Sequence, residues 1–225
     1  MTYLSLITNP IFFLFLLKID KDIAKLIQEG RCIYCGEKLD AAHFRRKEGF
    51  GIPKNCGDDC LIRFSFCCRK DGCRRRATAP SLRFLPGKSY LTVIISLMSI
   101  MTHGATKDRL RKLEEELKIS PQTIMKWRKW WREDFFKSDY WKVQKGYHSL
   151  MIKGEDFLSS LLENFIGKDS FAGLTSFLGF LSVHKSGDYI KISKLIQDHL
   201  KRLKIRKHGV EQQIDDDDIS SFLAE

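Results

Sequence analysis

The chain has 225 residues with 43% apolar content, enough for one larger domain or two small domains with ordinary cores, which excludes a disordered protein. Thirty-nine Lys and Arg against 28 Asp and Glu give a net charge of +11, so phosphates, acidic lipids or acidic proteins are the expected partners. All seven cysteines lie between residues 32 and 73, and this odd, clustered set argues against a disulfide framework and for one local site.

An apolar stretch opens residues 1–30 and is interrupted by Asn9 and Pro10. About 15 apolar residues fall short of the roughly 20 that a membrane helix needs. The stretch also lacks the basic segment and the small-residue cleavage site of a signal peptide. We therefore expect a buried or partner-packing helix in a cytoplasmic protein, with membrane anchoring or an overlong translation start as alternatives. Residues 21–30 show helical spacing.

Residues 31–86 are rich in Cys, Gly and Arg, and β-like pieces at 61–67 and 81–85 predict short strands joined by turns. The sequence RCIYCG contains a C-x2-C-G knuckle. Its gap of two residues lets the thiolates of Cys32 and Cys35 converge on one cation, and the glycine permits the turn. We predict a structural Zn²⁺ site with four protein ligands, which supplies folding free energy to a segment with little core of its own.

The sequence FCCRKDGC offers the second pair of ligands. Side chains alternate along a strand, so Cys67 and Cys68 point to opposite faces and only one of them reaches the metal easily. We choose Cys68, with Cys73 as the fourth ligand. Free thiols are the alternative for the whole cluster. Among the ligands, Cys67 could replace Cys68, the pair Cys56 and Cys60 could replace the later pair, and His43 is a further candidate.

Residues 87–137 contain a continuously apolar segment at 89–102, which predicts a buried helix, and then two amphipathic helical patterns separated by a tight turn. Ser120 is a good N-cap acceptor and Pro121 suits the first helical position, so the second helix begins there. This pattern indicates a helix-turn-helix. Its inner apolar positions are Leu113, Leu117, Ile119, Ile124 and Trp127.

The second helix has a polar face opposite its apolar one. Gln122, Lys126 and Lys129 lie on that face, with Thr123 and Arg132 beside it. Amide and basic side chains near the start of an exposed helix are those that contact bases in the major groove, Gln toward adenine and Lys or Arg toward guanine or phosphate. We predict that these residues bind DNA. The alternative is a solvated helical hairpin within a bundle.

Residues 138–208 carry periodic apolar runs that predict an all-helical module, and residues 209–225 form an acidic tail. The tail contains the contiguous run Asp215 to Asp218, which cannot converge as catalytic carboxylates do around two Mg²⁺ ions. We therefore expect no DNA cleavage by this chain. The predicted fold is mainly α with a small β zinc ribbon, and its helix-turn-helix domain is followed by a helical C-terminal module.

The order of these parts resembles the N-terminal zinc-ribbon and helix-turn-helix region of bacterial insertion-sequence transposases and their small accessory proteins. The motifs that carry the resemblance are the C-x2-C-G knuckle, FCCRKDGCRRRATAPS, the apolar helix and LEEELKISPQTIMKWRKWW, within about residues 30–137. The chain departs from that pattern at Lys118, where Gly is usual, and at Glu114, where a small residue is usual. The resemblance implies DNA recognition, with four cysteines as ligands: Cys32, Cys35, Cys68 and Cys73.

The basic residues Arg74, Arg75 and Arg76 are expected to contact DNA phosphates and fix the register of binding. We expect this basic ribbon and the second helix of the helix-turn-helix to present one surface to a duplex. Candidate partners are double-stranded DNA, a separate transposase or recombinase, and a second copy of this chain. A divergent transposase with its own catalytic carboxylates, or a DNA-binding regulator anchored at a membrane, are the alternative functions.

Overall fold

A computed structural model describes residues 9–46, 56–84, 106–117, 120–130, 170–182 and 189–205, with short pieces at 133–134, 137 and 141–142. Most of the described chain is helical, and it carries small antiparallel sheets, so the outline of the predicted fold is confirmed. The predicted buried helix at 89–102, the acidic tail at 209–225 and part of 138–208 lie outside the described residues.

One long helix, α2 (Pro10–Glu29), contains the apolar stretch from Pro10 onward. The Asn9 side chain accepts a hydrogen bond from the amide of Ile11 at 2.8 Å, and Pro10 occupies the first turn, where its missing N–H is not needed. The two residues expected to interrupt an apolar helix therefore begin one. Its apolar face is almost entirely buried and consists of Phe12, Phe13, Phe15, Leu16, Ile19 and Ile23.

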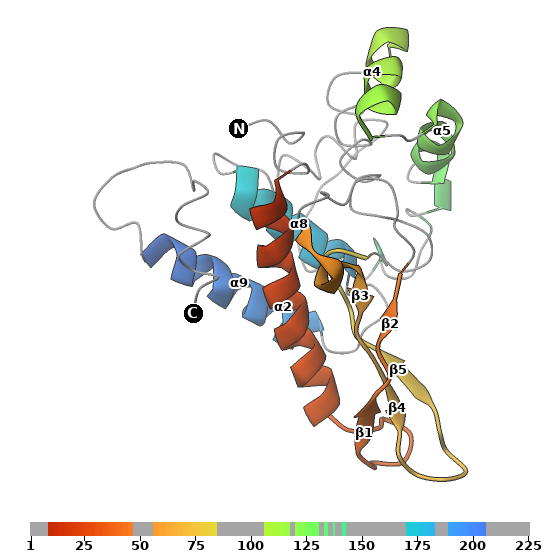
Figure 1. The fold of residues 1–225 in the computed structure, drawn as a ribbon, viewed down its shortest axis with the longest axis vertical. Coiled ribbons are helices and arrows are strands. Elements are labelled where there is room, and N and C mark those ends of the chain that lie inside the picture. The colour runs from red at the N-terminus through yellow and green to blue at the C-terminus, as the bar shows by residue number, and fades with distance from the viewer. Residues whose placement is uncertain are drawn as a thin grey trace.

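Two later helices cover the apolar face of α2. In Figure 1, α8 (Ser170–Ser182) and α9 (Tyr189–Ile205) pack on each other, and α9 also packs on α2. The ring centroid of Phe171 lies 5.0 Å from that of Phe12 and 5.0 Å from that of Phe15. These contacts confirm the expectation of a buried helix. Within the described part of the chain, no helix is long and apolar enough to span a bilayer.

Five short strands form two antiparallel sheets beside α2 (Figure 1). The first sheet has the strand order β1-β4-β5, and the second pairs β2 with β3. A turn of 3-10 helix, η2, leads into β3. The bounds are β1 (Leu39–Ala41), β2 (Phe44–Arg45), η2 (Asp58–Leu61), β3 (Ile62–Arg63), β4 (Ser65–Cys68) and β5 (Arg76–Thr78).

The strand predicted at 81–85 does not form over the described residues 81–84: residues 82 and 83 bend, and Phe84 makes an isolated bridge. The Ser81 hydroxyl accepts hydrogen bonds from the amides of Arg83 at 3.2 Å and Phe84 at 3.1 Å. A serine side chain that binds nearby backbone amides competes with strand pairing, which explains the bend.

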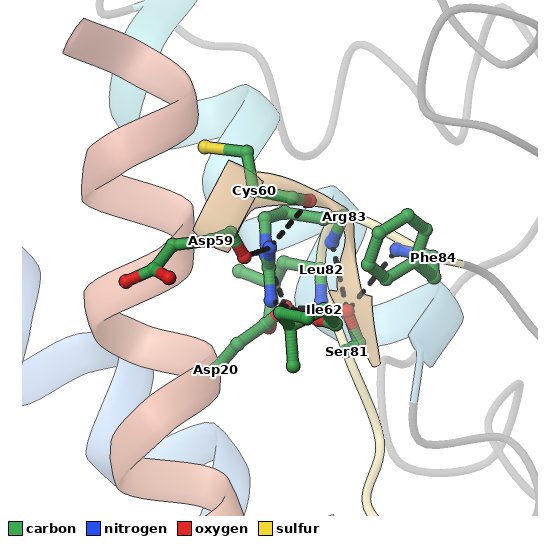
Figure 2. Close-up of polar contacts among 8 residues, drawn as sticks. All are labelled: Asp20, Asp59, Cys60, Ile62, Ser81, Leu82, Arg83 and Phe84. Atoms are coloured by element: carbon green, nitrogen blue, oxygen red, sulfur yellow. Dashed lines mark hydrogen bonds and ion pairs between the residues drawn. The ribbon is translucent and has the colours of Figure 1, made fainter. Parts of the chain in front are cut away.

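A buried ion pair joins this bend to α2 (Figure 2). The Arg83 guanidinium donates to the Asp20 carboxylate at 2.8 Å, and the amide of Leu82 donates to the same carboxylate at 2.7 Å. The hydroxyl of Ser81 is a third donor. The remaining guanidinium N–H groups donate to three backbone carbonyls, those of Asp59, Cys60 and Ile62. The network fixes α2 against the sheet region, because both buried charges have several partners.

The helices α4 (Lys107–Leu117) and α5 (Pro121–Trp130) pack on each other at one end of the molecule. In Figure 1 they lie at the opposite end of the long axis from the tip of the three-stranded sheet. A duplex that contacts both would have to run along this axis, and the expectation that ribbon and helix present one surface stays a prediction.

Candidate metal centre

Four cysteine side chains from two distant turns converge beside the three-stranded sheet. The sulfurs of Cys32, Cys35, Cys68 and Cys73 all lie within 4.8 Å of one another. Cys32 Sγ lies 3.8 Å from Cys73 Sγ, and Cys35 Sγ lies 3.4 Å from Cys68 Sγ. The four residues predicted as ligands are therefore close enough to hold a metal ion.

The spacing of the sulfurs fits Zn²⁺. A Zn–S bond of about 2.3 Å in a tetrahedral site puts neighbouring sulfurs about 3.8 Å apart, close to the separations seen here. Two of the thiols, Cys32 and Cys68, are buried, while Cys73 is half-buried and Cys35 is exposed. Four protein sulfurs leave no position for a substrate or a reactive water, so a metal here would stabilise structure.

The first cysteine turn, residues 31–37, is shaped by its own backbone. The amide of Gly36 donates to the carbonyl of Cys32 at 2.8 Å, and the amide of Cys32 donates to the carbonyl of Glu37 at 2.9 Å. Gly36 has a φ of 71°, in the left-handed region that glycine adopts without strain. The glycine after the second cysteine thus has the role that the sequence predicted.

The second cysteine turn, residues 68–75, closes in the same way with a wider loop. The amide of Cys68 donates to the carbonyl of Arg75 at 2.9 Å, and the amide of Cys73 donates to the carbonyl of Lys70 at 3.1 Å. Gly72 has a φ of 82° just before Cys73. This left-handed turn brings Cys73 back toward Cys68 across the four-residue gap between them.

An exposed ion pair connects the second cysteine turn to β1. Arg69 donates to the Asp40 carboxylate from Nε at 3.0 Å and from a terminal nitrogen at 2.6 Å. The amide of Arg69 also donates to the carbonyl of Lys38 at 3.0 Å. The hydrogen bonds from Arg69 lower the pKa of Asp40 below its usual value. The second turn is therefore held to the chain around β1 by contacts within the protein that do not depend on an ion.

Only one member of the vicinal pair reaches the cluster. Cys68 pairs with Leu39 across β1 and β4, and its sulfur points to the other three ligands. Cys67 points to the opposite face, where its thiol donates to the carbonyl of Arg74 at 3.4 Å. Strand alternation predicted this choice.

The environments of the thiols differ. The backbone amides of Tyr34 and then Cys35 donate to the sulfur of Cys32 and lower its pKa to about 7. Burial raises the pKa of Cys68 to about 12. Since a bound metal requires thiolates, metal binding would release the proton that burial holds on Cys68.

The alternative ligands lie elsewhere. The thiol of Cys56 donates to the carbonyl of Pro10 at 3.6 Å, and Cys60 is buried in η2. His43 Nδ1 lies 2.9 Å from the carbonyl oxygen of Ser65. None of these three side chains belongs to the cysteine cluster. Among the residues that the structure describes, this cluster is the single group of three or more potential ligands.

The polar residues predicted on the second helix lie on α5 as expected. Gln122, Lys126 and Lys129 are exposed, while Ile124 is buried. Thr123 is half-buried, and its hydroxyl lies 2.9 Å from that of Ser120, in the cap of the helix. Its hydroxyl is therefore engaged within the protein. Arg132 lies outside the described residues.

The predicted N-cap is also present. The amide of Thr123 donates to the Ser120 hydroxyl at 3.4 Å, and α5 begins at Pro121.

Lys129 Nζ lies 3.9 Å from a carboxylate oxygen of Glu133, an exposed pair that leaves the cation accessible.

The three basic residues predicted to bind phosphate are exposed at the tip of the sheet. Arg74 belongs to the second cysteine turn and has a φ of 44°. Arg75 stacks over the ring of Tyr34 at 4.1 Å, and Arg76 lies over the ring of Phe44 at 5.9 Å. Two of the three cations are thus held by aromatic rings.

Sequence reasoning missed the contacts that bind these parts together. Nothing in the local sequence marks Asp20 and Arg83, 63 positions apart, as partners, or Asp40 and Arg69, which are 29 positions apart. The sequence does carry a signal for Tyr34. An aromatic residue between the two cysteines of a knuckle cannot be buried in a core, so its side chain is expected on the surface.

Comparisons of this chain with protein-family models, curated proteins and solved structures find no match. The interpretation of the site therefore rests on its geometry and on the chemistry of its residues.

Proposed function

We propose that this chain is a zinc-stabilised DNA-binding protein related to insertion-sequence transposition. The observation that carries the proposal is the exposure of Gln122, Lys126 and Lys129 on one face of α5, while Ile124 on the other face is buried. An amide and two cations at the start of a capped, exposed helix suit the major groove.

In this proposal α4 and α5 act as a helix-turn-helix. α5 is the recognition helix, with Gln122 directed to a base edge and Lys126 and Lys129 to guanine or phosphate. The packing of α4 on α5 and the Ser120 cap support this role, since they fix the start of α5.

The cysteine cluster holds Zn²⁺ in a structural role. Its four ligands join the loop before β1 to the end of β4 and the turn that follows, in a region with few long strands. The ion would add folding free energy to that of the buried side chains of this region, among them Leu39, Phe66 and Leu82. The exposed Arg74 and Arg75 then lie on a rigid tip that contacts phosphates.

A salt titration of DNA binding tests the proposal. The full chain, purified with zinc, is bound to a set of random duplexes at several salt concentrations. We expect log K to fall steeply with log of the salt concentration, because each neutralised phosphate releases counterions, with a slope of about −0.9 per contact. Lys126→Ala and Lys129→Ala should each make the slope shallower by about one contact.

Lys194→Ala is the matched control. Lys194 is also an exposed helical lysine, but it lies on α9, away from α4 and α5. Its loss changes net charge equally and should leave the slope unchanged. A flat salt response, or equal effects of all three substitutions, would overturn the proposal.

A further inference from the structure

Two large apolar side chains project from the first cysteine turn. Ile33 is 87% exposed and Tyr34 is 61% exposed, and both lie between the ligands Cys32 and Cys35. Exposed groups of this size cost free energy in water unless a partner covers them. Their place beside a candidate metal centre indicates a contact surface.

The Tyr34 ring is held in place. Both residues beside the Ile33–Tyr34 pair are cluster cysteines, and the turn is closed by the bond from the Gly36 amide to the Cys32 carbonyl. On one face the ring carries the guanidinium of Arg75, whose carbonyl accepts the amide of Cys68. The stacked side chains of Tyr34 and Arg75 therefore join the two turns. Because both side chains are already held in place, binding a planar ligand would cost little conformational entropy.

The charge around this pair favours a nucleic acid. Residues 31–40 and 67–76 carry seven Lys or Arg and three carboxylates. Even a Zn²⁺ ion bound by four thiolates, with a formal charge of −2, leaves a positive surplus. One of the carboxylates, Asp40, is already paired with Arg69. A polyanion fits this tip better than a neutral apolar peptide.

An unpaired base is the group that fits the ring. Bases inside a duplex are stacked on both faces, so an aromatic side chain at the tip of the protein cannot stack on them. An unpaired base offers an open face. The tip also lies at the opposite end of the long axis from α5, so it contacts a different part of the nucleic acid.

We propose that Tyr34 and Arg75 form a stacking platform for an unpaired base at a single-stranded DNA end. The inference rests on the proposed function and adds a second contact to it. α5 would bind the duplex, and the cysteine turns would bind its unpaired end. Stacking on an aromatic side chain tolerates any base, so the platform would recognise the end by its unpaired state and not by its sequence.

The test compares two fluorescent duplexes of the same sequence with the full zinc-loaded chain. One is blunt, and the other has a short thymine overhang that carries one 2-aminopurine. We expect tighter binding of the overhang duplex, with quenching of 2-aminopurine by stacking. Tyr34→Ala should remove the quenching and weaken overhang binding roughly 5- to 150-fold, with blunt-duplex binding unchanged. Tyr34→Phe should retain both.

Arg75 and Lys70 provide a matched pair for the charge. Both are exposed cations of the second cysteine turn, but Arg75 alone stacks on Tyr34. Arg75→Lys keeps the charge and should reduce quenching, while Lys70→Ala should reduce affinity for both duplexes equally and leave the quenching intact.

The outcomes separate this inference from the proposed function. Equal affinity for the two duplexes, absent quenching, or an equal loss on both from Tyr34→Ala overturns the platform while duplex binding by α5 stands. Binding of neither DNA overturns both. Preference for a peptide or protein over the overhang duplex also overturns the platform.

Discussion

The guanidinium of Arg83 lies 2.8 Å from the carboxylate of Asp20, and both side chains are at most 1% exposed. The two residues are 63 positions apart in the chain. Arg83 also donates to backbone carbonyls around η2, so one side chain connects α2, η2 and the bend at residues 81–84. The stability of the cysteine-rich region therefore depends on a helix outside it.

Removal of one partner from this pair should destabilise the protein strongly. Arg83→Met leaves the Asp20 carboxylate buried without its cation, which costs about 3–5 kcal/mol in the free energy of unfolding. The exposed pair of Arg45 and Asp58 has a similar distance of 2.9 Å, but its side chains are 51% and 83% exposed. Arg45→Met should cost less than about 1 kcal/mol. Urea denaturation of both variants measures the difference, and equal costs would contradict this role.

A second buried arginine should behave in the opposite way. Arg63 is buried, and among the described residues its NH1 nitrogen has no hydrogen-bond partner. Burial lowers its pKa to about 10. Arg63→Met removes this desolvated charge and keeps the volume, so we expect unchanged stability or a gain of up to about 2 kcal/mol. A loss above about 1 kcal/mol in the same urea assay would show that Arg63 has a stabilising partner.

The neighbouring cysteines Cys67 and Cys68 allow a paired test of the metal site. Cys68→Ser removes a cluster sulfur, so the bound metal per chain should fall from about one toward zero and thermal unfolding should occur at least about 6 °C lower. Cys67→Ser changes a thiol on the other face and should leave both values unaltered. Elemental analysis and a melting curve give the two readouts. Metal loss in both variants would reject the assignment of ligands.

His199 should make the helical core sensitive to acid. Burial lowers the pKa of His199 below its usual value, although Asp22, 2.8 Å from Nε2, opposes this shift, while Arg202 and Lys18 reinforce it. Above about pH 6.5 the imidazole is neutral in both states and contributes no pH dependence. Below that pH the unfolded chain binds the proton more readily, so stability falls by up to about 1.4 kcal/mol per pH unit.

Urea midpoints at about pH 7.5, 6 and 5 measure this slope. His199→Gln should flatten it between about pH 6.5 and 5. An unchanged slope in His199→Gln would assign the acid sensitivity to other groups.

The cysteine cluster was predictable because its signals are local. The C-x2-C-G spacing and strand alternation depend on residues within a few positions, and they identified Cys32, Cys35 and Cys68 and separated Cys68 from Cys67. The start of α5 was predictable for the same reason, since Ser120 and Pro121 act on the adjacent turn.

The arrangement of these parts was not predictable from local patterns. Asn9 and Pro10 interrupt an apolar run in the sequence, yet they begin α2. The same two residue types can end one helix or cap the start of the next, and the sequence alone does not distinguish these roles. Residues 81–84 have the composition of a strand, but the Ser81 hydroxyl and the Asp20 carboxylate take their backbone amides. In the second case a distant partner, Asp20, took part.

The packing of α2 on α8 and α9 has a consequence for biosynthesis. About 140 residues separate the end of α2 from the start of α8, so a ribosome releases the phenylalanine-rich helix on the order of ten seconds before its cover exists. During that interval the apolar face of α2 is exposed to solvent on the nascent chain. A chaperone that binds this face would govern how much of the protein reaches the native state.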